Sequence, residues 1–303
     1  MKEIGGKVAV VTGASKGLGA YIAETLFDHG LKVVVAARSA SELEALTKRL
    51  DKQGQRTLAV TADVTKEADR TRLLDAARER FGQVDIIVNN AGTDHPQAFI
   101  DVDLDEARRM FDLNVMGTLA LTQAVLPEMM ARGSGHIVNI ASVAGLAPTP
   151  FGSVYAATKH AVVGFTESLR WEMEGTGVSA SVVCPYFVRE AGLYHDNTAG
   201  GESKVPTSSP QEVADAVVKA ITGDKARVVV SPFIVKLGPL GRAISPEIIF
   251  RAGRTNGSFD AMKGMADRLR EEEARATRAK ASGKGADADK PVKKTRPKSP
   301  AKA

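Results

Sequence analysis

The feature that most constrains this chain is the alternation of short apolar runs with longer segments of helical spacing. The apolar runs are continuous and rich in β-branched residues, which is typical of strands buried on both faces. Strands that alternate with helices predict an α/β fold, in which a doubly wound parallel sheet of about seven strands has helices on both faces. The expected strands are Lys7–Thr12, Lys32–Ala37, Thr57–Ala62, Val84–Val88, His136–Ala141, Val178–Cys184 and Arg227–Ser231.

A glycine-rich turn lies between the first expected strand and a helical pattern that continues to Phe27. Backbone N–H groups in such a turn, together with a helix N-terminus, can bind a pyrophosphate. The glycine spacing, G-x-x-x-G-x-G, differs from the common dinucleotide fingerprint G-x-G-x-x-G, and a purely structural turn is the alternative. The candidate phosphate-binding residues are Gly13, Ser15, Lys16, Gly17, Leu18 and Gly19.

The second expected strand leads into Arg38 and Ser39, about twenty residues after the glycines. An acidic residue at this place binds a ribose 2′-hydroxyl, whereas an arginine suits a 2′-phosphate. Lys16, in the glycine turn, could reach the same phosphate. The sequence therefore favours NADP(H) over NAD(H) as the cofactor, with a solvated strand-end arginine as the alternative.

Polar and small residues also follow the third and fourth expected strands. Asp63, which precedes Val64, could accept a hydrogen bond from an adenine amino group or could only cap a turn. Asn90, Ala91 and Gly92 would let a backbone lie close to a cofactor while the side-chain amide pins neighbouring strands. Both segments are therefore candidate cofactor contacts.

Ser142 follows the fifth expected strand, and Tyr155 and Lys159 lie four residues apart on an expected helix. Side chains at this spacing share one helix face. An ammonium beside a phenol favours phenolate, so we expect Lys159 to lower the pKa of Tyr155 from its usual value of about 10. Ser142 would hold the oxygen of a carbonyl or alcohol while Tyr155 exchanges its proton. Taken alone, Y-x-x-x-K can also be an ordinary amphipathic pair.

The candidate residues share one location in the expected sheet. Ligands of doubly wound sheets bind outside the carboxyl ends of the strands, and this common location predicts a site better than any single motif does. Asn114, in a long helical stretch, would usually be a packing or surface residue, but its carbonyl could hold a water near Lys159. The residues at strand ends are Gly13, Arg38, Asp63, Asn90, Ser142 and Pro185.

Charge and cysteine content narrow the function classes. The net charge of +5 lies entirely in residues 281–303, which contain seven Lys or Arg and two Asp, so the body of the chain is formally neutral and no specific nucleic-acid partner is expected. The single cysteine, Cys184, cannot form an internal disulfide, and no Cys/His cluster has metal-ligand spacing. We expect a metal-free, cytoplasmic protein with neither a signal peptide nor a transmembrane helix.

With T-G-A-S-K-G-L-G, D-V, N-N-A-G, Asn114, Ser142 and Y-A-A-T-K in this order, the chain resembles the short-chain dehydrogenase/reductase family over about residues 5–232. The resemblance implies a Rossmann-type fold and hydride transfer between a nicotinamide and a carbonyl or secondary alcohol. It implies that Tyr155 is the general acid/base and that Ser142 orients the substrate oxygen. It also implies that Lys159 lowers the pKa of Tyr155 and binds the nicotinamide ribose, while Asn114 holds a proton-relay water.

The same resemblance assigns the cofactor contacts. Gly13, Ser15, Gly17 and Leu18 would line the phosphates, and Asp63, Val64 and Asn90 the adenosine side. After the sixth strand the family pattern is P-G-x-V-x-T, so Pro185 matches and backbone contact through Val188 is expected. Tyr186 replaces the glycine, and Glu190 replaces a threonine that bonds the nicotinamide carboxamide. These two departures support an alternative function, a non-catalytic NADP(H)-binding sensor or scaffold.

The C-terminal quarter of the chain is expected to differ from the rest in structure and composition. We expect residues 1–255 to form one oxidoreductase domain, 256–280 a charged helix and 281–303 a disordered basic tail. Val228–Phe250 is apolar but interrupted by prolines, and should cover the substrate pocket, a second subunit or a membrane surface.

The expected partners are a small carbonyl or alcohol substrate and a second copy of the chain, in a homodimer or another homo-oligomer, with peripheral membrane contact as a further alternative. Phe151, Tyr186, Phe187 and Tyr194 suggest an apolar pocket, suited to lipid-like, steroid-like or aromatic carbonyls.

Overall fold

The computed structural model describes residues 1–197, 205, 207–231, 247, 254–255 and 257–281. Most of the apolar segment Val228–Phe250 and nearly all of the basic tail lie outside these residues, so the expectations for them stay predictions. None of the helices in the described part of the chain combines the length and apolar character that crossing a membrane requires.

Within the described residues, seven strands pair in parallel in the order β3-β2-β1-β4-β5-β6-β7. The order reverses between β1 and β4, which makes a topological switch point at the carboxyl ends of these strands. The predicted Rossmann-type sheet is confirmed. The strands are β1 (Val8–Thr12), β2 (Lys32–Ala37), β3 (Thr57–Thr61), β4 (Ile86–Asn89), β5 (Gly135–Ile140), β6 (Val178–Pro185) and β7 (Arg227–Val230).

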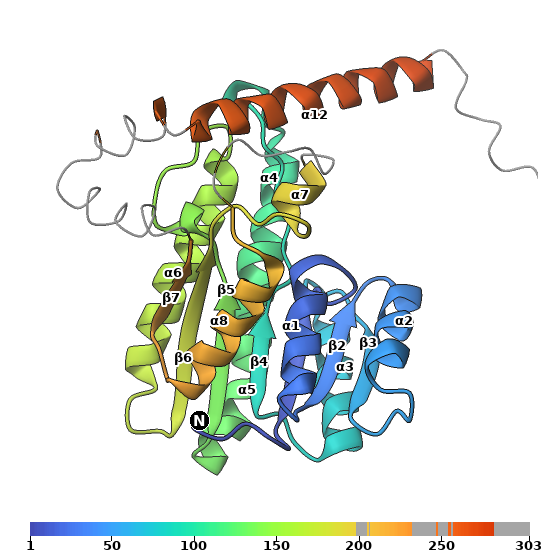
Figure 1. Ribbon diagram of the computed structural model, residues 1–303, viewed down its shortest axis with the longest axis vertical. Helices are drawn as coiled ribbons and strands as arrows, with labels where there is room; N and C mark the ends of the chain where they lie inside the picture. Colours follow the sequence, from blue (N-terminus) through green and yellow to red (C-terminus); the bar gives the residue numbers. More distant parts are fainter. Residues whose placement is uncertain (198–204, 206, 232–246, 248–253, 256, 282–303) are drawn as a thin grey trace, which may run out of the picture.

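Helices cover both faces of this sheet (Figure 1). The longer helices are α1 (Gly17–Asp28), α2 (Ala40–Leu50), α3 (Glu67–Phe81), α4 (Leu104–Phe111), α5 (Gly117–Arg132), α6 (Ser153–Glu172), α8 (Pro210–Thr222) and α12 (Ser258–Ala281). The shorter ones are α7 (Leu193–Asn197), the 3₁₀ turns η1 (Phe99–Asp101) and η3 (Val143–Gly145), and the π-helical turn η2 (Asp112–Met116).

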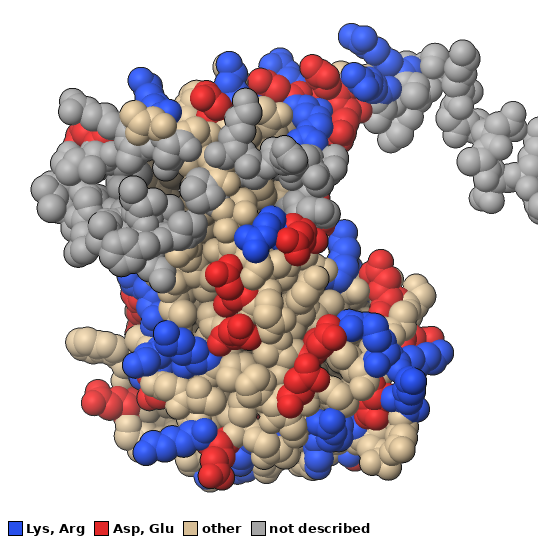
Figure 2. All heavy atoms as spheres, viewed as in Figure 1, with Lys and Arg blue, Asp and Glu red and all other residues tan. Residues whose placement is uncertain are grey.

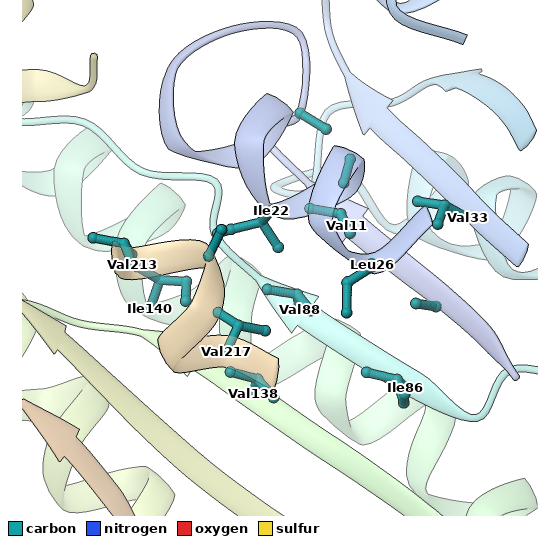
Figure 3. Packing of buried hydrophobic residues seen from close by; sticks show 14 of the residues in the cluster. Val11, Ile22, Leu26, Val33, Ile86, Val88, Val138, Ile140, Val213 and Val217 are labelled. Atoms are coloured by element: carbon teal, nitrogen blue, oxygen red, sulfur yellow. The ribbon is translucent and has the colours of Figure 1, made fainter. Parts of the chain in front are cut away.

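The core has two main layers, one on each face of the sheet. On one face, α1, α2 and α8 pack against the strands, and Figure 3 shows Ile22 and Leu26 of α1 beside Val213 and Val217 of α8. On the other face, α3, α5 and α6 bury a second set of aliphatic side chains. Because both faces are covered, the strands are continuously apolar, as the sequence indicated.

The sequence predicts helix caps at Ser41-Glu42-Leu43-Glu44 and at Ser209-Pro210-Gln211-Glu212, because each has a serine three residues before a glutamate. The capping box at Ser209 and Glu212 is confirmed: the Ser209 hydroxyl accepts from Glu212 N at 3.2 Å, and the Glu212 carboxylate accepts from Ser209 N at 2.6 Å. The capping box expected at Ser41 and Glu44 is wrong. Helix α2 follows β2 so closely that it begins at Ala40, which places Ser41 inside its first turn.

Candidate active site

A cleft of about 990 Å³ opens at the carboxyl ends of the strands. It brings together nearly all of the residues that the sequence predicts for the site, although they come from six different strand ends and two helices. The predicted residues that line it are Gly13, Ser15, Lys16, Gly17, Leu18, Arg38, Ser39, Asp63, Val64, Asn90, Ala91, Gly92, Ser142, Tyr155, Lys159, Pro185 and Val188. Gly19 and Asn114 are not among the lining residues.

The glycine turn is held by contacts too close for any side chain. A Cβ atom at Gly19 would lie 2.3 Å from the carbonyl oxygen of Gly13 and 2.7 Å from Nδ2 of Asn90. The Asn90 amide donates to the carbonyl oxygens of Thr12 and Gly13, at 3.0 and 3.2 Å. Gly19 therefore packs against Gly13 within the turn and against Asn90, which follows β4, while its contact with the cofactor stays a prediction. Gly13 and Gly17 adopt left-handed φ values of 64° and 61°.

Two cationic side chains lie at the β2 end of the cleft. Arg38 is exposed, and the Lys16 ammonium, whose side chain is 72% exposed, lies 3.4 Å from Oδ2 of Asp196 on α7. Arg38 forms no ion pair with another described residue. Both cations are therefore accessible to an anionic group that enters from solvent.

Asp63 caps a turn, as one of its two predicted roles requires. Its Oδ1 accepts from the backbone N and the hydroxyl of Thr65, at 3.0 and 2.7 Å. Burial would raise the pKa of Asp63, but these hydrogen bonds and the nearby charges of Lys66 and Arg38 hold it below its usual range. Asp63 also lines the cleft, so the adenine contact stays a prediction.

Ser142, Tyr155 and Lys159 converge at the centre of the cleft. The Ser142 hydroxyl accepts from Ala144 N at 3.1 Å, donates to the carbonyl oxygen of Pro185 at 3.4 Å, and lies near enough to the Tyr155 phenol to influence its pKa. The buried Lys159 ammonium donates to the carbonyl oxygen of Ile140 at 2.9 Å and lies 5.6 Å from the centre of the Tyr155 ring. The end of β5 and the first turns of α6 thus place three polar groups around one space.

A glycine that the sequence analysis did not single out fixes this placement. A Cβ atom at Gly145 would lie 2.6 Å from the carbonyl oxygen of Lys159, so η3 can approach α6 this closely only with glycine there. The approach sets the distance between Ser142 and the helix that carries Tyr155.

The surroundings shift the pKa values of Tyr155 and Lys159, and the shift at Tyr155 is opposite to the prediction. Burial, followed by the charge of Asp94, raises the pKa of Tyr155, and the Ser142 hydroxyl only partly offsets the increase. The Lys159 charge, which we expected to lower this pKa, is not among the causes of the shift, because Lys159 is already neutral at the pH where this buried phenol would lose its proton. Burial lowers the pKa of Lys159 to about 8, although Asp94 opposes the change.

Asp94 is a cleft residue that the sequence analysis missed. Its Oδ1 is buried and has no hydrogen-bond partner among the described residues. Burial raises the pKa of this carboxyl to about 6, while the His95 backbone N–H and the Lys159 charge act in the opposite direction. Its only sequence signal was its position two residues after Gly92, at the end of a strand-end motif.

Asn114 lies in η2, where the chain makes a π-helical turn. Its Nδ2 donates to the carbonyl oxygen of Thr93 and to the Thr158 hydroxyl, at 2.9 and 3.1 Å, and its Oδ1 accepts from Thr93 N at 2.8 Å. The side chain therefore clamps the segment after β4 onto α6. The water that we expected the Asn114 carbonyl to hold near Lys159 stays a prediction, because the bond from Thr93 N leaves its amide oxygen a second lone pair.

Aromatic side chains form the other end of the cleft. Phe187 lies between Tyr186 and Tyr194, with ring centres 4.6 and 4.4 Å apart. Glu190 has a left-handed φ of 69°, is exposed, and does not line the cleft. Helix α12 also lines the cleft, which was not expected because its sequence predicted only a charged helix; its lining residues are Ser258, Phe259, Met262 and Met265.

The sequence and the fold of this chain are similar to those of known proteins. The family model for short chain dehydrogenase matches residues 7–199. A ketoacyl reductase, HetN, from Nostoc sp. (strain PCC 7120) is 37% identical over 265 residues, covering 86% of this chain and 92% of its own length.

Two solved structures are similar in fold and sequence. A short chain dehydrogenase/reductase from Burkholderia phymatum in complex with NAD is 31% identical, with a TM-score of 0.71, and the match covers 78% of this chain and 92% of that one. An actinorhodin polyketide ketoreductase with NADPH is 32% identical, with a TM-score of 0.66, over 74% of this chain and 95% of that one. The chain therefore belongs to the short-chain dehydrogenase/reductase family, whose members are NAD(P)-dependent enzymes acting on C=O and CH–OH groups.

Proposed function

We propose that this protein is an NADP(H)-dependent reductase of apolar ketones. The observation that carries the proposal is the convergence of Ser142, Tyr155 and Lys159 in one cleft with the glycine turn and Arg38. The apolar lining beyond these residues favours a substrate with an apolar body.

The residues present fit a nicotinamide dinucleotide phosphate. Gly13 and Gly17 leave a cradle without side chains at the N-terminus of α1, where a pyrophosphate is favoured. Arg38 and Lys16 supply two accessible cations where the 2′-phosphate of NADP(H) would lie, and an arginine binds such a group through paired N–H donors. When bound, the reduced nicotinamide supplies the hydride that the carbonyl carbon receives.

The chain's own residues would handle the oxygen and the proton. Ser142 donates a hydrogen bond to the carbonyl oxygen and holds it beside Tyr155. The raised pKa of Tyr155 keeps its phenol protonated near neutral pH, so the phenol donates its proton as negative charge develops on that oxygen. The Lys159 ammonium stabilises the phenolate that remains. Asn114, whose side chain also holds Thr93, would place a relay water near Lys159 through its carbonyl.

A contact of Tyr186 weakens the alternative that this protein is a non-catalytic sensor or scaffold. The Tyr186 hydroxyl shares a hydrogen bond of 2.8 Å with the Ser258 hydroxyl at the start of α12. The tyrosine that replaces the family glycine thus has a structural partner, and its presence no longer indicates a lost activity.

The test is NADPH consumption by the full-length protein with a panel of ketones, followed by absorbance and by chromatography of the alcohol formed. We expect turnover with apolar ketones and a higher kcat/KM with NADPH than with NADH. Tight NADPH binding without turnover across the whole panel would favour the sensor. A preference for NADH would refute the assignment of Arg38.

We further propose a homo-oligomer. Phe111, Met116 and Trp171 on α4, η2 and α6 are 39%, 55% and 83% exposed, which is unusual for side chains of this size. Light scattering on the purified protein tests this: a monomeric mass at micromolar concentration would contradict it.

A further inference from the structure

Helix α12 has two different faces. Figure 1 shows it lying across the end of the molecule where α7 also lies, and Figure 2 shows charged side chains of both signs on its outer surface. On the inner face, Met262, Met265 and Ala266 are only 3%, 3% and 5% exposed. Their spacing is that of one helix face, so α12 is amphipathic although most of its residues are polar.

Contacts near its N-terminus attach α12 to the core of the protein. The Tyr186 hydroxyl, beyond β6, forms the hydrogen bond with Ser258. The ring of Phe259 packs against that of Phe151, before α6, with ring centres 5.6 Å apart. The terminal methyl of Met262 lies near Gly152, where an added Cβ would be 3.7 Å away. The first turns of α12 therefore sit against the two segments that flank the acid–base residues.

Ionic contacts hold the middle of the helix. His95 lies between two carboxylates, with Nδ1 2.8 Å from Glu106 on α4 and Nε2 3.2 Å from Glu273 on α12. Arg270 lies 3.8 Å from Asp101. Surface ion pairs of this kind contribute little individually, but together they fix the orientation of α12 and keep its methionine face directed inward.

The inward face belongs to the same cleft as the acid–base residues. Phe259, Met262 and Met265 line the cavity that Ser142 and Tyr155 also line. Methionine side chains are flexible and polarizable, so they adapt to apolar groups of varied shape. No phosphate or ribose of the cofactor needs such a surface.

We propose that α12 is the substrate-recognition helix of this protein and that Phe259, Met262 and Met265 contact the apolar chain or ring system of a ketone held at Tyr155. The inference rests on the proposed reductase function and names its substrate class: ketones with an extended apolar body. Because each methylene that leaves water for this surface strengthens binding, kcat/KM rises by about fourfold for each methylene added, until the space beneath α12 is filled.

The experiment uses the full-length protein, NADPH and methyl ketones from acetone to methyl nonyl ketone. In the wild type, kcat/KM rises along the series. Met262→Trp and Met265→Trp fill the space beneath α12, so the ratio of kcat/KM for methyl nonyl ketone to that for butanone falls by at least about tenfold. Lys263→Trp is the matched control, because Lys263 is exposed on the same helix, and it leaves this ratio unchanged.

A ratio that stays at the wild-type value in both methionine variants overturns the inference while the reductase function stands. If the tryptophan variants fail to fold, Met262→Ala and Met265→Ala replace them, and the same ratio falls about threefold or more because contact area is lost.

A ligand-binding experiment without turnover tests the role of α12 separately from the reductase function. With NADP⁺ present and no turnover, methyl nonyl ketone displaces the fluorescent apolar dye anilinonaphthalene sulfonate at lower concentration from the wild type than from Met265→Trp. If no ketone is reduced but this difference is at least about tenfold, the function fails and the role of α12 stands. Equal displacement from both proteins refutes the role of α12.

Discussion

The two ends of the cleft are built in different ways. At the nucleotide end, β1, α1 and β4 meet through backbone atoms and glycines, with Asn90 and Thr12 closing the contacts. At the substrate end, Tyr186, α7 and α12 meet through side chains from segments far apart in the chain. The nucleotide end therefore depends on close backbone packing, whereas the substrate end depends on side-chain packing between distant segments.

The largest effect, a loss of NADPH affinity, should come from a substitution in the glycine turn of the nucleotide end. Gly19→Ala places a methyl group 2.3 Å from the Gly13 carbonyl oxygen, so the turn must move away from β4. Overpacking of this kind costs about 1–3 kcal/mol, and we expect NADPH affinity to fall by up to roughly a hundredfold. Isothermal titration with NADPH measures the change.

Gly164→Ala is the matched control for this variant. An added Cβ at Gly164, inside α6, has no heavy atom within 4 Å. Alanine should therefore stabilise the helix by about 0.5–1 kcal/mol and leave NADPH affinity unaltered. Equal NADPH affinity in the Gly19 and Gly164 variants would show that the glycine turn does not bind the cofactor.

The next effect concerns the cofactor's 2′-phosphate. Arg38→Asp removes a charge-assisted pair worth about 1.5–3 kcal/mol, so the ratio of kcat/KM for NADPH to that for NADH should fall at least about tenfold. Steady-state kinetics with both cofactors measures it, with Arg108→Asp, an exposed charge change on α4, as the control. An unaltered ratio would mean that Arg38 is only a solvated strand-end residue.

A smaller effect tests the substrate end. Tyr186→Phe removes one hydrogen bond to Ser258, worth about 0.5–1.5 kcal/mol, and should raise KM for long methyl ketones about two- to tenfold by loosening α12. Ser258→Ala removes the same bond from the other side. If the bond carries the effect, the double variant is no worse than either single one, and additive losses would contradict that explanation.

The smallest effect is a shift of a pH profile. Lys159 loses its charge near pH 8, so ketone reduction should decline as the pH rises through that value. The Asp94 carboxylate raises the pKa of Lys159, and Asp94→Asn removes this support. The decline should then begin at a lower pH in the variant than in the wild type. Rates measured from pH 6 to about pH 10 would contradict the account if both profiles coincide or if the variant declines later.

The sequence predicted the nucleotide end better than the substrate end for a physical reason. A strand, a glycine turn and a helix are adjacent in the chain, so residue spacing alone places Gly13, Gly17 and Asn90. Spacing does not show the contact of Gly19 with Asn90, because Asn90 is a neighbour in space rather than in the chain.

The residues that were missed act through burial or tertiary contact. Met262 and Met265 lie among many charged residues of α12, and only the packed structure shows where their face points. The raised pKa of Tyr155 likewise depends on burial and on Asp94, which the four-residue spacing to Lys159 could not reveal. Only the structure shows that Asn114 clamps Thr93, while the water near Lys159 stays a prediction.

The proposed ketone reduction depends most directly on Tyr155 as the proton donor. We predict that Tyr155→Phe lowers kcat for ketone reduction by at least about a hundredfold, because general acid catalysis contributes about 10²–10⁴-fold. The dissociation constant for NADPH should stay within about twofold of the wild-type value, since the phenyl ring remains. Tyr21→Phe, at an exposed position on α1, is the control and should change neither quantity. Reduction by Tyr155→Phe at more than about a tenth of the wild-type rate would contradict the account.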